Sequence, residues 1–256
     1  MMYFSSQTYY TVIGVVVCLL QDICLDVYGW NVCSNTVPTL RRRPSIRLWS
    51  YSCRTLPEED VEKICASGGP KAHVYGEMTV LGLRELMTEI SVKENDVFLD
   101  LGSGSGELVI QAAQEFGQIA LGIELSKSRH EEALRNLASI PSSQPQPRVT
   151  FVCGDAAGID AQQLLSSTKS PPTIVWCSNL LFDRNLQGRI ADTIGSYGTN
   201  VRAVASLTSF PNGIPGMTLH TNNRHIEMSW TVNKQQAGHP PLPGHPCSIY
   251  YSSSPK

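Results

Sequence analysis

The chain has 256 residues, enough for one domain of ordinary size or for one domain with an extension. Hydrophobic residues make up 41% and charged residues 16%, which allows a sizeable core and excludes global disorder. Lys and Arg total 20 while Asp and Glu total 22, a formal net charge of -2, which excludes a uniformly basic nucleic-acid-binding protein.

The chain begins with an apolar segment at residues 9–20. Its 12 residues are too few for a helix that crosses a bilayer, which needs about 20, so we expect no stable membrane insertion. The length suits the core of a signal peptide or a buried element. Residues 1–8 carry no Lys or Arg, which argues against a signal peptide.

A basic segment follows at residues 34–56, which contain several Ser and no acid. Three interpretations fit: part of an organellar transit peptide, a short arm that contacts DNA or directs nuclear import, or an unstructured extension. We predict that residues 1–56 form a poorly ordered N-terminal extension and that residues 57–256 form one domain. The arginines that would make weak DNA contacts are Arg41, Arg42, Arg43, Arg47 and Arg54.

Eight cysteines are present, and no two form a C-x-x-C pair. Some fall in predicted core strands of a chain too long to need a disulfide framework, so we expect reduced, structural cysteines. His239 and His245 have no partner at ligand spacing, so we expect no metal site. The cysteines are Cys18, Cys24, Cys33, Cys53, Cys65, Cys153, Cys177 and Cys247.

Regular structure is predicted from Pro57 onward, where a proline and three acids open a helix. Apolar residues at helical spacing predict helices at 78–90 and 109–116, on either side of a buried strand at 96–101 and a glycine-rich turn at 102–106.

Strands and helices then alternate, which predicts a mainly parallel, doubly wound sheet that ends in an antiparallel hairpin. In such a sheet the ligand lies beyond the carboxyl ends of the strands. Helices are expected at 126–138, opened by Ser126, and at 184–197. Strands are expected at 119–125, 149–153, 173–178, 201–207, 224–232 and 247–252, with a Gly/Pro-rich loop at 238–246 between the last two and no helix there.

The glycine-rich turn distinguishes between nucleotide-binding folds. It reads G-x-G-x-G from Gly102, with Glu107 where a dinucleotide fingerprint needs its third glycine, and it lacks the Gly-Lys-Ser/Thr of a P-loop. Asp100 precedes it, and an acid at that place suits a ligand with a positive end. The D-x-G-x-G-x-G pattern resembles motif I of the class I S-adenosylmethionine (AdoMet) methyltransferases.

Acids end three successive predicted strands or follow them closely: Asp100, Glu124 and Asp155. Glu124 is placed to accept both hydroxyls of a ribose, and Asp155 to meet an adenine amino group. The competing interpretation is that each acid caps the following helix.

Outside this core the chain resembles the disruptor-of-telomeric-silencing family, histone lysine methyltransferases built on the class I fold instead of the SET fold. Val74-Tyr75-Gly76-Glu77 precedes the first core strand. Ser178-Asn179-Leu180-Leu181-Phe182 is similar to the family's Asn-Asn-Phe-Ala-Phe motif. Ile226 to Thr231 is similar to its Val-x-x-Ser-Trp-Thr strand, and Tyr250-Tyr251 to its paired tyrosines.

The resemblance implies a seven-stranded class I methyltransferase sheet, AdoMet as the cofactor, a lysine in the core of histone H3 in the nucleosome as the acceptor, and a nuclear location. It implies these cofactor-binding residues: Tyr75, Glu77, Thr79, Asp100, Gly102, Ser103, Gly104, Gly106, Glu107, Glu124, Asp155 and Ala156. For the methyl-transfer end and the lysine channel it implies Ser178, Asn179, Phe182, Trp230 and Tyr250.

Two alternatives stay open. The hydrophobic and Arg-rich front motivates a class I methyltransferase of a non-histone protein or small molecule, in a mitochondrion or plastid. Ser178 stands where the family has Asn and cannot make both amide hydrogen bonds, which motivates an AdoMet-binding module with weak catalysis. For Phe182, Trp230 and Tyr250 the competing interpretation is ordinary core packing.

Overall fold

The computed structural model describes residues 56–159, 164, 170–236 and 244–253. The predicted extension, its arginines and cysteines, and most of the loop at 238–246 with His239 lie outside these residues. Within them, no helix is both long and apolar enough to cross a membrane. The described cysteines, Cys65, Cys153, Cys177 and Cys247, are free.

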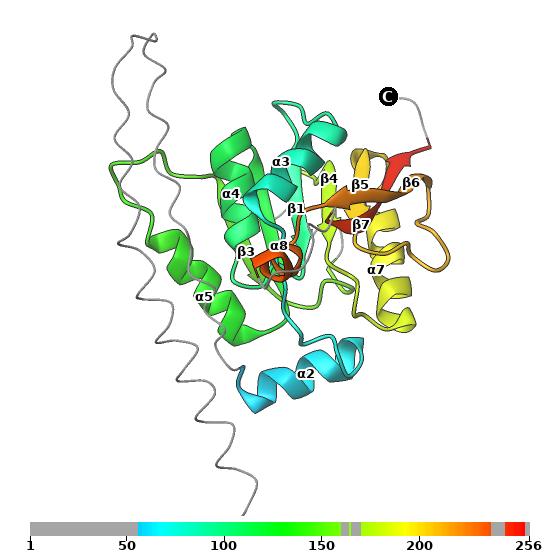
Figure 1. Ribbon diagram of the computed structural model, residues 1–256, viewed down its shortest axis with the longest axis horizontal. Coiled ribbons are helices and arrows are strands. Elements are labelled where there is room, and N and C mark those ends of the chain that lie inside the picture. The colour runs from blue at the N-terminus through cyan, green and yellow to red at the C-terminus, as the bar shows by residue number, and fades with distance from the viewer. Residues whose placement is uncertain (1–55, 160–163, 165–169, 237–243, 254–256) are drawn as a thin grey trace, which may run out of the picture. The chain divides into compact units, whose positions relative to one another are not determined.

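A seven-stranded sheet organises the domain, with strand order β3-β2-β1-β4-β5-β7-β6 (Figure 1). The first five strands in this order are parallel, and β7 pairs antiparallel with both β5 and β6. The class I methyltransferase fold predicted from the sequence is therefore confirmed. The strands are β1 Val97–Leu101, β2 Ile119–Glu124, β3 Val149–Cys153, β4 Ile174–Cys177, β5 Ala203–Ser206, β6 Met217–Ile226 and β7 His245–Ser252.

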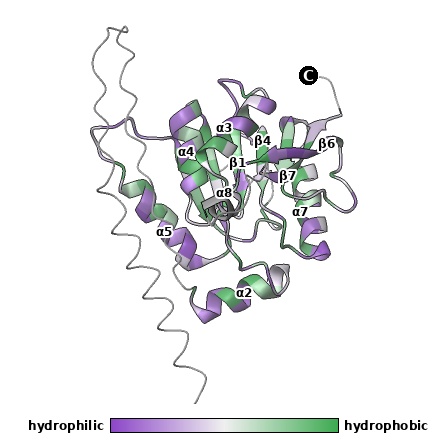
Figure 2. Cartoon of the chain, in the orientation of Figure 1, coloured by the Kyte–Doolittle hydropathy of each residue, from purple (hydrophilic) through white to green (hydrophobic). Residues whose placement is uncertain are grey.

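Helices cover both faces of the sheet because its central strands are apolar on both sides (Figure 2). In β1, Phe98 packs with α3 and α4, while Leu99 packs on the opposite face with α7. The helices are α2 Glu58–Gly68, α3 Val80–Glu89, α4 Glu107–Phe116, α5 Lys127–Ala138, α7 Arg184–Ser196 and α8 Ser229–Gln236, and a short 3-10 turn spans Gly198–Asn200.

The helix α8 is a correction to the sequence analysis. The expected strand at 224–232 ends at Ile226, and a helix begins at Ser229 where no helix was expected between the last two strands. The segment alternates apolar and polar residues as a strand does, but long-range contacts decide its conformation. Ser229 N–H donates to Glu77 O, and Met228 forms an antiparallel bridge with Met78. The antiparallel pairing of β6 with β7 is retained.

Strand β6 forms one edge of the sheet. Most of its side chains are polar and exposed, and its pairing with β7 shifts register twice, after Leu219 and after Thr221.

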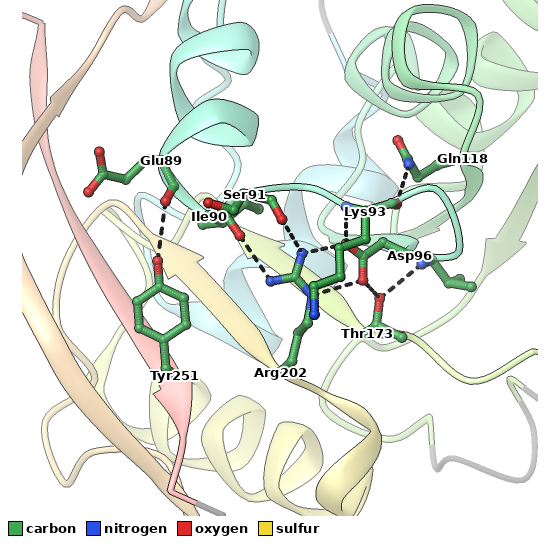
Figure 3. A network of polar contacts seen from close by, with 10 residues as sticks. Glu89, Ile90, Ser91, Lys93, Asp96, Gln118, Thr173, Arg202 and Tyr251 are labelled. Carbon is green, nitrogen blue, oxygen red and sulfur yellow. Dashed lines mark hydrogen bonds and ion pairs between the residues drawn. The ribbon is translucent and has the colours of Figure 1, made fainter. Parts of the chain in front are cut away.

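The amino ends of three strands are joined by a buried ion pair (Figure 3). Asp96 lies just before β1, and its carboxylate binds the guanidinium of Arg202, which lies just before β5. The same carboxylate accepts hydrogen bonds from Lys93 N at 2.7 Å and from the Thr173 hydroxyl, just before β4, at 2.7 Å. The side chains of Asp96 and Arg202 are only 5% and 15% exposed.

Arg202 also closes the end of α3. Its guanidinium donates to the carbonyl oxygens of Ile90 and Ser91 at 2.9 and 3.1 Å. Carbonyls at a helix end lack partners within the helix, so this one side chain satisfies both them and the buried acid.

We predict that Arg202→Met lowers the free energy of unfolding by about 3 kcal/mol, because it leaves the Asp96 charge buried without its partner. Urea denaturation at pH 7 measures this. Arg84→Met is the matched control, since Arg84 pairs with Glu115 at the surface, with side chains 37% and 22% exposed, and such pairs contribute about 0–1 kcal/mol. Equal costs for the two variants would contradict the prediction.

The same pair has a pH signature. Burial by itself raises the pKa of Asp96, but the hydrogen bonds and charge of its partners outweigh burial and hold the pKa below its usual range. The stabilisation is therefore present above the ordinary pKa of about 3.9 and is lost as the pH falls through the lowered value. In Arg202→Met, the free energy of unfolding should therefore fall less than in the wild type as the pH is lowered through this range.

Candidate functional site

The glycine-rich turn between β1 and α4 lies at the carboxyl edge of the sheet. Gly104 has a φ of +54°, and a Cβ there would meet the ring of Tyr75, so both backbone conformation and space require glycine. Its N–H points at the next strand and donates to Glu124 Oε2 at 2.8 Å.

Glu124 ends β2, beside β1, and is 5% exposed. Its second oxygen, Oε1, accepts the Ser126 N–H at 2.8 Å, so the carboxylate is fixed from both sides. A carboxylate has about four acceptor positions, and each oxygen keeps one for a further donor. Glu124 lines a cavity on this edge, so these positions are available to a ligand with paired hydroxyls.

Asp100 lies in β1 immediately before the turn and is 3% exposed. Its Oδ1 has no hydrogen-bond partner among the described residues. Burial raises its pKa well above the usual range, and the negative charges of Glu124 and Glu77 raise it further. A cationic group at this place would supply the missing interaction and restore the charged form.

Asp155 follows β3 and is partly occupied by structural contacts. Its Oδ1 accepts the Ala157 N–H at 2.9 Å, and its Oδ2 pairs with Arg189 at 3.2 Å. The competing interpretation, that the acids cap the following helices, fails for the first two: Gly106 and Ser126 are the N-caps of α4 and α5.

A segment from His73 to Glu77 covers the glycine-rich turn. The Tyr75 hydroxyl bonds the Glu77 carboxylate and accepts the Ser105 N–H at 3.1 Å. The guanidinium of Arg129, on α5, lies 4.7 Å from the centroid of the Tyr75 ring and donates to His73 O at 2.7 Å. The covering segment is thereby held to both the glycine-rich turn and α5.

The cavity enclosed by these elements brings seven of the predicted site residues together. They come from the ends of β1 to β4, the segments that follow them and the covering segment, as the doubly wound sheet requires. These lining residues are Tyr75, Gly102, Glu124, Asp155, Ala156, Ser178 and Phe182.

The other ten predicted residues, Asp100 among them, do not line this cavity, and four of the ten have structural contacts of their own. Thr79 is the N-cap of α3 and donates to Glu227. Asn179 is fully buried, and its amide bonds the backbone of Thr208 through both its oxygen and its nitrogen. These two side chains have local structural partners that account for them.

The two predicted channel aromatics also lie in packed surroundings. Tyr250 is 2% exposed in the core beside α7, and its hydroxyl accepts the Phe210 N–H. The ring of Trp230 lies against Gly76 and in edge contact with His245, with 5.9 Å between ring centroids. Trp230 supports the covering segment from behind, and its place in a lysine channel stays a prediction.

Sequence reasoning missed Arg129 and Ser126 as site residues. Arg129 lines the cavity and Ser126 orients Glu124; the sequence indicated Ser126 only as the start of a helix, and Arg129 belongs to no pattern that a single sequence displays. The one available signal was position, since both follow the strand end at Glu124 within one helical turn.

A model of the family described as "Histone methylation protein DOT1" matches residues 69–236. The chain belongs to the DOT1 family. The match begins just after α2, spans all the strand ends described above, and confirms the resemblance seen in the sequence. With the class I fold, family membership makes AdoMet the cofactor of this domain.

Curated relatives match short stretches. A "Histone-lysine N-methyltransferase, H3 lysine-79 specific" from Emericella nidulans is 41% identical over 56 residues, which are 22% of this chain and 11% of that protein. A "Protein-lysine N-methyltransferase" from Saccharolobus islandicus is 36% identical over 56 residues, 22% of this chain and 35% of that protein. The matches thus span about a tenth of the fungal relative's length and about a third of the archaeal one's.

Among solved structures, a SAM-dependent methyltransferase from Thiobacillus denitrificans in complex with S-adenosyl-L-homocysteine is similar, with 26% identity and a TM-score of 0.39. The similarity covers 53% of this chain and 51% of that one.

Glu107 opens α4 behind the covering segment and generates a prediction. Burial raises its pKa to about 8, and the nearby carboxylates of Glu77, which shares a hydrogen bond with it, and of Glu132 contribute. Because the folded pKa exceeds the ordinary 4.5, the folded chain holds a proton that the unfolded chain has lost between these values. The free energy of unfolding must therefore fall as the pH rises through this window.

We expect Glu107→Gln to remove this dependence, so its melting temperature exceeds that of the wild type by at least ~2 °C at pH 8.5 and matches it near pH 4.5. Differential scanning calorimetry across the range measures it. Glu131→Gln, at an exposed position on α5, is the control and should not change the profile. A gain of the same size at both pH values would contradict the assignment.

Proposed function

We propose that this chain is an AdoMet-dependent lysine N-methyltransferase that acts in the nucleus on a lysine in the core of histone H3. One observation carries the proposal: in a chain of the DOT1 family, Glu124 and Asp155 at neighbouring strand ends line one cavity, and Asp100, on the strand beside Glu124, has a buried oxygen without a partner among the described residues.

The residues present fit the cofactor. Glu124, held by two backbone N–H groups, presents its remaining lone pairs to the ribose hydroxyls. Asp100 faces a positive group of the ligand, and Asp155 with Ala156 borders the adenine. AdoMet supplies a methyl group activated on a positively charged sulfur.

We propose that the covering segment shifts outward when the cofactor enters. The cavity measures about 100 Å3, whereas small-molecule sites usually exceed about 300 Å3. Tyr75 lies against Gly104 and narrows the entrance. An outward shift of this segment enlarges the site without disturbing the sheet.

Ser178 and Phe182 also line the cavity, and we propose that they receive the acceptor amine. A lysine must be neutral to accept a methyl group, and an apolar, desolvated environment such as the Phe182 ring favours the neutral amine. The Ser178 hydroxyl is placed to accept one hydrogen bond from it. We keep Asn179, Trp230 and Tyr250 as supporting residues of this end.

We expect the full-length chain to transfer a radiolabelled methyl group from AdoMet to histone H3 in recombinant nucleosomes. Glu124→Ala and Asp100→Ala should each reduce the label at least ~10-fold, because a charged hydrogen-bond partner of the cofactor contributes about 1.5–3 kcal/mol. The exposed-site variant Glu131→Ala is the control. Undiminished label in both acid variants would sink the proposal.

A second candidate is methylation of a non-histone protein lysine, which the archaeal relative's description favours. Localisation of a full-length fluorescent fusion discriminates, since the histone proposal requires nuclear signal and a mitochondrial or plastid signal supports the alternative. For the histone proposal, DNA contact falls to Arg41, Arg42, Arg43, Arg47 and Arg54, because the net charge of the chain is -2.

A further inference from the structure

The helix α2 precedes the stretch that the family model matches, yet it contributes to the cavity wall through Ile64 and Ser67. Its acids differ sharply in environment. Glu58, Glu59 and Glu62 are exposed, whereas Asp60 is 7% exposed. Burying a carboxylate costs free energy unless hydrogen bonds compensate, so the surroundings of Asp60 indicate its role.

One oxygen of Asp60 collects three hydrogen bonds from the first turn of α5. Oδ2 accepts the hydroxyls of Ser126 at 2.6 Å and Ser128 at 2.5 Å, and the Ser128 N–H at 3.0 Å. Burial raises the pKa of Asp60, but these bonds outweigh it and lower the pKa, so the acid is charged at neutral pH. A negative charge at a helix N-terminus is also favourable.

The residue that Asp60 holds is also the residue that orients Glu124. Ser126 donates its hydroxyl to Asp60 and its N–H to Glu124 Oε1 at 2.8 Å. The Ser126 hydroxyl in turn accepts the Arg129 N–H, as the N-cap of α5. A continuous path of contacts thus runs from α2 through Asp60 and Ser126 to the carboxylate that faces the cavity.

Further contacts fix α2 to the loops that follow three strands. Lys63 donates to Leu125 O at 3.3 Å, after β2. Arg189 bridges Ser67 O at 3.0 Å and Asp155, after β3. Gly68 O accepts the Asp183 N–H at 2.8 Å, after β4. The helix α2 is therefore in contact with the segments that follow β2, β3 and β4, which are the strands other than β1 whose ends build the cavity.

We infer that Asp60 is a positioning residue of the cofactor site: through Ser126 it sets the orientation in which Glu124 receives the two ribose hydroxyls, which makes α2 a working part of that site. This inference rests on the proposed function, since it assumes that an adenosine-containing cofactor occupies the cavity. Asp60 itself need not touch the cofactor.

A double-mutant cycle on the full-length chain tests it, with S-adenosylhomocysteine binding measured by isothermal titration calorimetry. Asp60→Ala should weaken binding about 10-fold, as loss of a supporting residue typically does. In a Glu124→Ala background the same change should have less than about a 2-fold effect, because the group it positions is absent. Glu62→Ala, exposed on the same helix, should bind as the wild type does.

A second readout separates positioning from general damage. Asp60→Ala should reduce affinity for 5′-methylthioadenosine, which has both ribose hydroxyls, and leave affinity for its 2′,3′-dideoxy analogue unchanged. If Asp60→Ala fails to fold, the milder Asp60→Asn, which keeps the side-chain volume, goes through the same cycle. Equal losses for the two ligands, or equal losses with and without Glu124, overturn the inference.

Failure of the proposed function is recognised separately. A wild-type chain that binds neither S-adenosylhomocysteine nor 5′-methylthioadenosine contradicts the proposed function, and the inference falls with it. A wild type that binds both, with Asp60→Ala binding equally well, overturns only the role of Asp60.

Discussion

Asp100 and Glu124 lie side by side at the carboxyl ends of adjacent strands, each no more than 5% exposed. Two buried carboxylates repel each other, and Asp100 gains no hydrogen bond for its Oδ1 among the residues that the structure describes. The fold tolerates this because Glu124 takes up two backbone N–H groups and Asp100 shifts toward its neutral form. A positive group beside Asp100 would supply the missing interaction and favour its charged form.

Such a site subtracts from stability, so the stability must come from elsewhere in the molecule. At the amino ends of β1 and β5, Asp96 and Arg202 form a buried pair in which both oxygens of Asp96 are engaged. At the carboxyl edge of the sheet Asp100 has an oxygen without a partner among the described residues, whereas at the amino edge Asp96 is fully paired. Functional sites commonly lower stability in this way.

Local patterns in the sequence were sufficient to predict most of the fold and part of the site. Strands of continuous apolar residues, the glycines of the turn and the cap at Ser126 are local signals, and each predicted the element that is found. The alternation of apolar and polar residues at 224–232 predicted a strand throughout. The conformation of this segment is instead determined by contacts with Glu77 and Met78, about 150 residues earlier in the chain. No local signal reports contacts at that distance.

The same limit applies to the site. Glu124 was predictable from its position at a strand end, but Asp60 and Arg129 act through contacts that join separate helices. Asn179 and Tyr250 were chosen by resemblance, and the structure gives each a local bonding role that no pattern indicated. Motifs therefore locate a site, whereas burial and partners determine what each side chain in it does.

The outer strand β6 has a consequence for how the molecule behaves among its own copies. An unpaired strand edge is a template on which another chain can add a strand and start aggregation. Here the two register shifts make the edge of β6 irregular. Its exposed polar side chains, such as His220, Asn222 and Arg224, would lose their contact with water if another strand were added. The polar, irregular edge at β6 therefore disfavours the addition of a strand from a second copy of the chain.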